Sequence, residues 1–327
     1  MKYSLYLVLF IFLISGCSGK KYYEPTDVEG EFEVSKKSMK SYIKSMNKIG
    51  GTLENGVFVS ELGLSEMNLA KDFNFINLSD DKKIIATNNL DKILIDNIEI
   101  NTENPVIAAS LVGDRLAVIY SNNSVELFDI NSNKTLFKEY FSLSLANDVR
   151  VTNPVFMGSL VLFPTLDGRL IIVSLVSNEI VRNIAVDPDN EFKNIIALGL
   201  LNNDETLIVA SSNKILSISP RDTISKEYNI RDIIFKEDKI YLANIEGEII
   251  KMNSSLDEES SIKLKYAKIL ALAYSESLYA LESQGFLINL DKNLDSEKVY
   301  KFYFDNEKRV LSIDNKLYFD KNYIELP

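Results

Sequence analysis

The chain has 327 residues, a formal net charge of −11 at pH 7, and neither histidine nor tryptophan. The acidic balance argues against nucleic acid as a partner, because Lys and Arg dominate binding to a phosphate backbone. Without histidine, the chain lacks the commonest general base and the commonest metal ligand. Its single cysteine, Cys17, excludes an intramolecular disulfide.

The first sixteen residues have the organisation of a bacterial export signal. Lys2 supplies a positive charge, and an apolar run follows over residues 3–13, interrupted only by Ser4. This run is too short to cross a bilayer as a helix, which takes about 20 apolar residues. It has the length of a signal-peptide core. The sequence therefore predicts that residues 1–16 are a cleaved signal.

The residues at the predicted cleavage site, Ile-Ser-Gly-Cys over 14–17, resemble the bacterial lipobox. The expectation is that Cys17 is lipidated, the alternative being an ordinary signal peptide with a stray cysteine. Residues 17–29 are predicted to be a flexible tether. Ser18 stands where an inner-membrane retention signal has Asp, so a Gram-negative host would hold the protein at the periplasmic face of the outer membrane.

A module recurs along the chain, in which a β-prone apolar run leads into a polar or Gly turn and a second apolar run. The copies start at Ile84, Leu116, Leu160, Leu207, Ile240, Leu278 and Val310. Their spacing averages about 38 residues, near the period of about 40 to 50 that four-stranded propeller blades show. Turn pairs such as Asp167-Gly168 tolerate a positive φ and close tight hairpins.

This repeat predicts an all-β fold, a β-propeller of four-stranded antiparallel blades over residues 30–327. Each hairpin would supply the middle strands of a blade. Inner strands are expected at segments such as 194–200 and 268–273, and outer strands at 135–140 and 179–185.

Residues 51–69 form a weaker eighth unit, so eight blades are expected and seven are the alternative. Met39, Tyr42, Ile43 and Met46 have helical spacing, which leaves residues 38–49 open to a helix. A pair of β-sandwiches or a β-helix is the alternative fold. The absence of an internal linker disfavours the sandwiches, and the long period disfavours the β-helix.

The sequence offers no catalytic residue, cofactor site or metal site. Acidic residues are scattered among turns, and no Gly-rich phosphate loop is present. The segment Asp-Pro-Asp-Asn-Glu at 187–191 alternates oxygen ligands as calcium loops do, but it lacks their central Gly and final Glu. It is interpreted as an exposed turn between blades.

The lipobox and hairpins such as residues 160–181, with Asp-Gly-Arg-Leu at 167–170, resemble the BamB (YfgL-like) family and the quinoprotein-like propeller repeats. BamB is the lipoprotein of the outer-membrane β-barrel assembly machinery. The chain departs from that pattern by lacking the tryptophans that lock blades. The resemblance implies a non-enzymatic scaffold of eight blades that docks on the periplasmic domains of the outer-membrane insertase and helps deliver unfolded barrel clients.

The same resemblance places a partner contact on a loop before a mid-chain blade. Residues 146–154 occupy the comparable place here, with Arg150 as the candidate partner-binding residue and a solvated loop charge as the alternative. A solute- or surface-ligand-binding propeller lipoprotein is the competing function. A quinone-dependent dehydrogenase is disfavoured, because no tryptophan or vicinal disulfide is available to stack on the cofactor.

Overall fold

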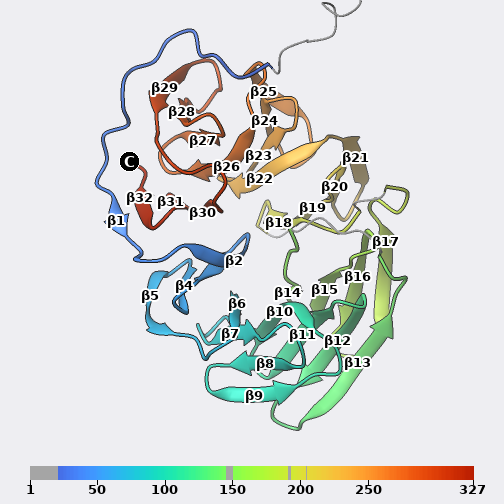
Figure 1. The fold of residues 1–327 in the computed structure, drawn as a ribbon. Helices are drawn as coiled ribbons and strands as arrows, with labels where there is room; N and C mark the ends of the chain where they lie inside the picture. Colours follow the sequence, from blue (N-terminus) through green and yellow to red (C-terminus); the bar gives the residue numbers. More distant parts are fainter. Residues whose placement is uncertain (1–20, 145–149, 191–192, 204) are drawn as a thin grey trace, which may run out of the picture.

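The computed structural model describes residues 21–144, 150–190, 193–203 and 205–327. The described residues form 32 strands and contain no helix. The strands make eight four-stranded antiparallel sheets, which are arranged as blades of a ring (Figure 1). The all-β propeller with eight blades that the repeat predicts is confirmed. The predicted signal and Cys17 lie outside the described residues.

Blades 1 to 7 are each built from four consecutive strands. The strands of blades 1 to 4 are β2 (Ile43–Asn47), β3 (Gly50–Leu53), β4 (Val57–Ser60), β5 (Gly63–Asn68); β6 (Asn74–Leu78), β7 (Ile84–Thr87), β8 (Lys92–Ile95), β9 (Ile98–Asn101); β10 (Val106–Val112), β11 (Arg115–Tyr120), β12 (Ser124–Asp129), β13 (Lys134–Tyr140); β14 (Val155–Met157), β15 (Leu160–Pro164), β16 (Arg169–Ser174) and β17 (Ile180–Ala185).

The strands of blades 5 to 7 are β18 (Ala197–Leu201), β19 (Thr206–Ala210), β20 (Lys214–Ile218), β21 (Thr223–Glu227); β22 (Ile230–Lys236), β23 (Lys239–Asn244), β24 (Glu248–Met252), β25 (Glu258–Lys263); β26 (Ile269–Tyr274), β27 (Leu278–Glu282), β28 (Phe286–Leu290) and β29 (Glu297–Lys301). The first strand of each blade is the inner one. We call the face on which the inner strands begin the start face, and the opposite one the end face.

Blade 8 closes the ring by joining the two ends of the chain. It contains β30 (Leu311–Ile313), β31 (Lys316–Phe319), β32 (Asn322–Glu325) and, as outer strand, β1 (Lys37–Ser38). In the antiparallel register Lys37 faces Tyr323 and Ser38 faces Asn322. The Val310 hairpin therefore supplies the inner and second strands, where the sequence predicted the middle pair.

Residues 38–49 contain no helix, and the helical alternative for this segment is wrong. Ile43–Asn47 is the inner strand of blade 1 and pairs with β3, with a bulge after Ile43. Ladder hydrogen bonds to a neighbouring strand satisfy the backbone here, and they override the local spacing of the apolar residues.

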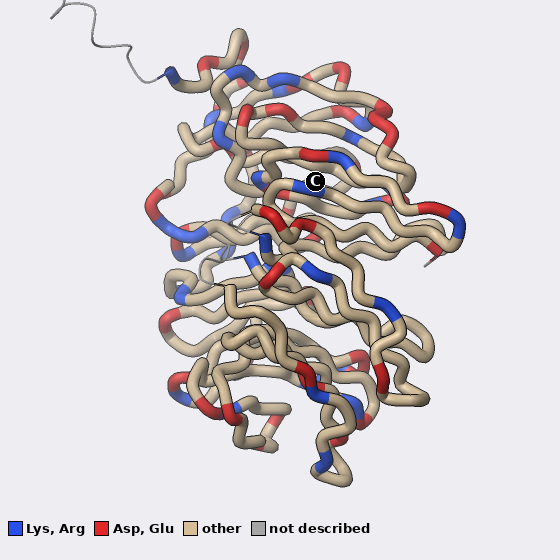
Figure 2. The backbone as a smooth tube through the Cα atoms, turned by 90° about the vertical axis from the view of Figure 1, so that its right-hand side faces the viewer, with Lys and Arg blue, Asp and Glu red and all other residues tan. Residues whose placement is uncertain are grey.

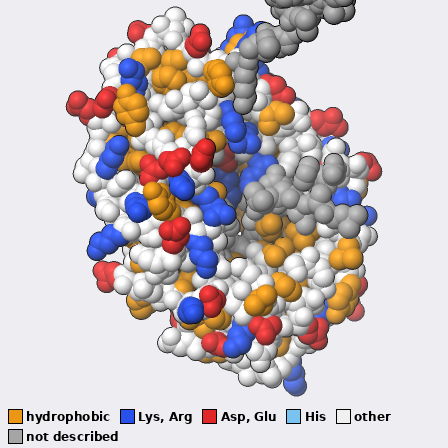
Figure 3. All heavy atoms as spheres, viewed as in Figure 1, with side chains coloured by type: hydrophobic (Ala, Val, Ile, Leu, Met, Phe, Trp, Pro, Cys, Tyr) orange, Lys and Arg blue, Asp and Glu red, His pale blue; other side chains and the backbone are white. Residues whose placement is uncertain are grey.

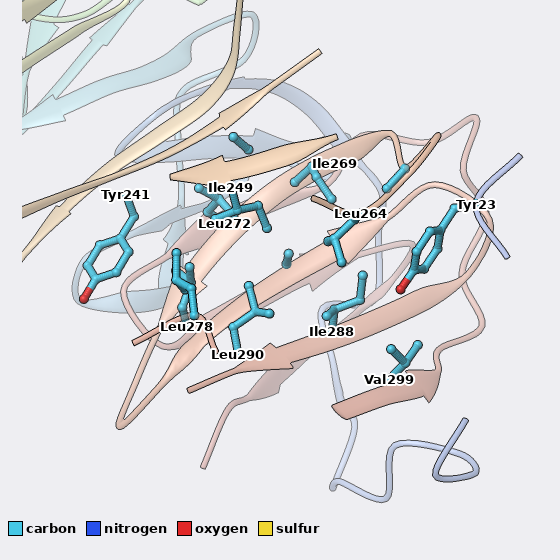
Figure 4. Close-up of a cluster of buried hydrophobic side chains, with 14 of the residues drawn as sticks. Tyr23, Tyr241, Ile249, Leu264, Ile269, Leu272, Leu278, Ile288, Leu290 and Val299 are labelled. Atoms are coloured by element: carbon cyan, nitrogen blue, oxygen red, sulfur yellow. The ribbon is translucent and has the colours of Figure 1, made fainter. Parts of the chain in front are cut away.

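The core is divided among the junctions between neighbouring blades. The junction of blades 6 and 7 holds fifteen buried residues, among them Leu272, Ile288 and Tyr241 (Figure 4). Between blades 1 and 2 the corresponding cluster has three, Phe73, Ala86 and Leu94. Burial of each Leu or Ile side chain contributes about 1.5–3 kcal/mol of stability. The junctions between blades are therefore stabilised to different extents.

Tight turns between the middle strands fix the outer strands. Gly247, between β23 and β24, has φ of 76°, and its carbonyl accepts a 2.8 Å hydrogen bond from the N–H of Leu264, just after β25. Gly285 accepts the same bond from Phe302 in blade 7. Asn123 takes the turn position in blade 3, with φ of 61°. Backbone hydrogen bonds thus attach the outer strand to the central turn of the blade, without the tryptophan that serves this purpose in related repeats.

The N-terminal segment, residues 21–36, runs along the outside of blades 7 and 8 (Figure 1); we call it the strap. Tyr23 is buried in the junction of blades 6 and 7 (Figure 4). The N–H of Glu29 donates to the carbonyl of Val299 at 2.9 Å. The described part of the predicted tether is therefore packed against the propeller. Within the described ranges, no helix has the length and apolar character needed to cross a bilayer.

Candidate binding site

The central channel of the ring widens into a cavity near each face. The start-face cavity, which we call the mouth, has a volume of about 330 Å³ and is bordered by residues of β2, β22, β26 and the segment leading into β30. The end-face cavity measures about 510 Å³. Lys48 borders both. The mouth is within the size range of small-ligand pockets, about 300–1,000 Å³.

Positive charge is concentrated in the mouth. Its lining includes Lys48, Arg150, Arg231 and Arg309, against one carboxylate, that of Asp232. Lys and Arg side chains gather beside the central hollow in Figure 3. Elsewhere acidic and basic residues are interspersed along strands and turns (Figure 2). A surplus of cations in a chain of net charge −11 makes the mouth a candidate site for an acidic ligand.

The end-face cavity has a different electrostatic character, because its cations are paired. Lys236 binds Asp314 at 2.5 Å, and Lys82 binds Glu61. Both pairs bring together residues that line the cavity. This cavity therefore has no comparable surplus of positive charge.

Arg150 reaches the mouth from the loop between β13 and β14. Its Nη1 donates to the carbonyls of Ile230 at 3.0 Å and of Arg231 at 2.8 Å. Nη2 donates to Ser212 Oγ at 3.2 Å, and its own carbonyl accepts 2.9 Å from the amide of Asn194. The side chain thus spans from blade 4 past blade 5 to blade 6, and it is held in place.

The sequence singled out Arg150 as a partner-binding residue, and a partner contact there stays a prediction. The structure brings it together with Arg231 and Arg309, which sequence reasoning missed. Arg231 Nε donates 3.1 Å to the carbonyl of Ile269, and Arg309 Nη1 donates to the carbonyl of Lys44. Each arginine bridges two blades. The available signal was an arginine near the beginning of an inner strand: Arg231 is the second residue of β22, and Arg309 lies two residues before β30.

An ion pair forms part of the lining of the mouth. Lys48, at the end of β2, binds the carboxylate of Asp232 in β22, so the pair joins blade 1 to blade 6 across the channel. The Asp232 side chain is only 7% exposed, and its other oxygen accepts 2.7 Å from the N–H of Leu272. Lys48 lines both cavities, whereas Asp232 lines only the mouth.

The 187–191 segment takes a structural role where it is described. Asp187 is buried, and its carboxylate accepts hydrogen bonds from Ser211 Oγ at 2.6 Å and from the amide of Asn190 at 2.5 Å. The interpretation as an exposed turn is wrong for Asp187, because this side chain fastens blade 4 to blade 5. Across the described residues, no cluster of three acidic, Cys or His side chains could hold a metal ion.

Known proteins resemble this chain in sequence. No family model matches it. The plasminogen-binding protein PgbB of Helicobacter pylori strain J99 is 30% identical over an alignment of 385 positions, which covers 98% of this chain and 71% of that protein. The chain belongs to the PgbB family. The PgbB of Helicobacter pylori strain 26695 is 29% identical, over 98% of this chain and 70% of its own length.

Solved structures show that the fold of this PgbB-family chain is widespread. BamB from Moraxella catarrhalis superimposes with a TM-score of 0.68 at 14% identity, over 90% of this chain and 99% of that one. The C-terminal WD40 domain of Sif2 gives 0.63 at 13% identity, with coverage of 90% and 99%. The designed protein Ika8 gives 0.58 at 12%, with coverage of 91% and 99%. At such identities the likeness shows the fold alone.

Proposed function

We propose that this chain is a non-catalytic, membrane-anchored binding propeller that holds an acidic segment of a protein ligand at its mouth. Membership of the PgbB family over 98% of the chain carries this proposal. The named relatives are plasminogen-binding proteins, so plasminogen is the first ligand to test. The function matches the ligand-binding alternative considered from the sequence better than the assembly role.

The mouth supplies the chemistry that such a ligand needs. An arginine presents a planar fork of N–H donors that pairs with a carboxylate through two parallel hydrogen bonds. Arg309 is the most accessible arginine of the mouth, since its residue is exposed whereas Arg150 and Arg231 are half-buried. Because exposed charges are screened over about 8 Å at physiological ionic strength, binding is expected to weaken as salt is added.

The test is binding to immobilised plasminogen, measured by surface plasmon resonance at several salt concentrations. Arg309→Gln removes a charge at the mouth and should weaken binding about 5- to 30-fold, the equivalent of about 1–2 kcal/mol for one charge-assisted contact. Arg221→Gln is the matched control, because Arg221 is exposed in the β20–β21 turn on the end face. Equal affinity of the two variants would place the ligand elsewhere, and absence of binding by the unchanged protein would exclude plasminogen.

Anchoring through Cys17 at the outer membrane is part of the proposal. The lipobox at residues 14–17 supports it. Cells grown with labelled palmitate should incorporate label into the protein, and Cys17→Ala should abolish both the label and recovery in the membrane fraction. A labelled Cys17→Ala variant would contradict lipidation at this residue.

A second candidate is the scaffold role in assembly of outer-membrane β-barrels, through the insertase's periplasmic domains and unfolded barrel clients. Its support is the position of Arg150, on a loop ahead of a mid-chain blade and inside the mouth. A tagged protein purified from detergent-solubilised envelopes should then bring the insertase with it, and protease added to whole cells should leave the protein intact. If the protease cleaves the protein and the insertase does not co-purify, the ligand-binding role is favoured.

A further inference from the structure

A cationic and aromatic patch lies on the start face where blades 6 and 7 meet. Lys21 and Lys265 each place Nζ 5.3 Å from the ring centroid of Tyr266. Tyr266 is 44% exposed, and Tyr22, next to Lys21, is 49% exposed. We call these four residues the rim patch. In Figure 1 the described chain starts beside β25, at the opposite side of the ring from β9 and β13.

The strap fixes this patch relative to the propeller. The Tyr23 ring packs edge-on against Phe286, 5.8 Å between centroids, and lies beside Val299 and Ile288 (Figure 4). Further along, the N–H of Lys301 in β29 donates 2.7 Å to Gly30. Lys21 is therefore attached to the body two residues before a buried anchor point.

The distance from the patch to Cys17 is short. Lys21 is the fourth residue after Cys17, and a chain extends at most about 3.6 Å per residue, so the two are at most roughly 14 Å apart. A lipid on Cys17 would thus hold the rim patch close to the membrane. Tyrosine rings favour the headgroup level of a bilayer, and lysines are attracted to anionic headgroups.

We propose that the rim patch rests on an anionic lipid surface, so that the propeller stands on the rim of blades 6 and 7. Blades 2 and 3, which are opposite in the ring, then lie farthest from the membrane, and the mouth opens sideways to ligands. The inference rests on the lipid anchoring proposed above. The chain's net charge of −11 makes an anionic surface repel most other orientations, and Arg150 and Arg231 are engaged with backbone carbonyls inside the ring.

The test uses single cysteines as fluorophore sites, since the chain has no cysteine besides Cys17. Gln284→Cys reports on the start face of blade 7, Leu90→Cys on the start face of blade 2, and Val176→Cys on the end face; all three positions are exposed. The lipidated protein is reconstituted into phosphatidylglycerol-containing vesicles with nitroxide-labelled lipid. Quenching at position 284 should exceed that at 90 and 176 several-fold. Equal quenching at 284 and 90 means a face-down disc and overturns the proposal.

The variants separate the patch from the anchor. The fourfold variant Lys21→Ser, Tyr22→Ser, Lys265→Ser and Tyr266→Ser should remove the difference between the probes. A control variant with one lysine and one tyrosine replaced, Lys134→Ser and Tyr140→Ser, both exposed on β13, should leave it intact. A second arm replaces the lipid with a hexahistidine tag bound to nickel-chelating lipid. Mass spectrometry of Cys17 reports on lipidation alone, so failed anchoring and failed orientation give different results. If quenching is the same at positions 284, 90 and 176 in both arms, the proposed orientation is wrong.

Discussion

Gly247 shows how one backbone position can hold a blade together. A Cβ added there would lie 2.4 Å from the carbonyl oxygen of Leu264, at a φ that side chains disfavour. Gly113 is the control, since its φ of 56° is also positive but nothing lies within 4 Å of its added Cβ. Both residues sit in turns between strands, so the comparison isolates the close contact from the cost of the backbone conformation.

Gly247→Ala should lower the free energy of unfolding by about 3 kcal/mol, because strain and clash add. Gly113→Ala should cost about 1 kcal/mol, the price of a left-handed conformation for a side chain. Urea denaturation followed by circular dichroism checks both. Similar losses for the two variants would mean that the turn relaxes without disturbing the outer strand.

At the scale of elements, the strap depends on one aromatic side chain. Tyr23 is 6% exposed, and its hydroxyl finds no hydrogen-bond partner among the described residues. Burial in the junction raises its pKa. The ring thus supplies the packing, while the hydroxyl adds an unsatisfied polar group.

Tyr23→Ala should therefore cost about 3 kcal/mol, as large-to-small changes of buried aromatics do, and should expose the strap to limited proteolysis. Tyr23→Phe keeps the ring and removes the hydroxyl, so stability should change by less than about 1 kcal/mol. Thermal unfolding and timed trypsin digestion measure the two effects. Equal digestion of both variants would show that the ring does not hold the strap.

The elements that the sequence revealed are those whose pattern is local. Runs of alternating and buried apolar residues around Asp-Gly or Asn turns identify the hairpins from blade 2 to blade 7. Strand β1 could not be found in this way, because its two residues pair with Asn322 and Tyr323 at the other end of the chain. The helical spacing around Ile43 predicted the wrong element, because backbone pairing with β3 determines the conformation of that segment.

The mouth was only partly predictable for the same reason. Arg150 could be placed on a loop before a mid-chain blade, but Arg231 and Arg309 belong to blades far along the chain. The three meet only because the ring closes around a shared axis. A site assembled from several repeats becomes visible when equivalent positions of the repeats are superimposed in space.

For the whole molecule, stability depends on the junctions between neighbouring blades, which follow one another around a closed ring. The junction of blades 1 and 2 has the smallest buried cluster, with Phe73, Ala86 and Leu94, although Phe58 also stacks on Phe75 at 5.2 Å. The junction of blades 6 and 7 is the largest. Local unfolding is easiest where the density of buried apolar contacts is lowest.

Hydrogen exchange should consequently be faster in β6 and β7 than in β26 and β27, which occupy the same positions in their blades. Exchange measured by mass spectrometry on peptides covering these strands tests this, with β10 and β11 as intermediate reference. Equal protection of all inner strands would mean that the ring opens only as one cooperative unit.

The pairing of β1 with β32 has a consequence for biosynthesis. Because a polypeptide is synthesised from its N-terminus, Lys37 and Ser38 are made long before their partners Tyr323 and Asn322. Blade 8 cannot be completed before the final strands arrive, and such distant pairing slows folding. A product that is truncated before β32 leaves the ring open and β1 unpaired. Ring closure therefore requires that synthesis has passed β32, which ends at Glu325.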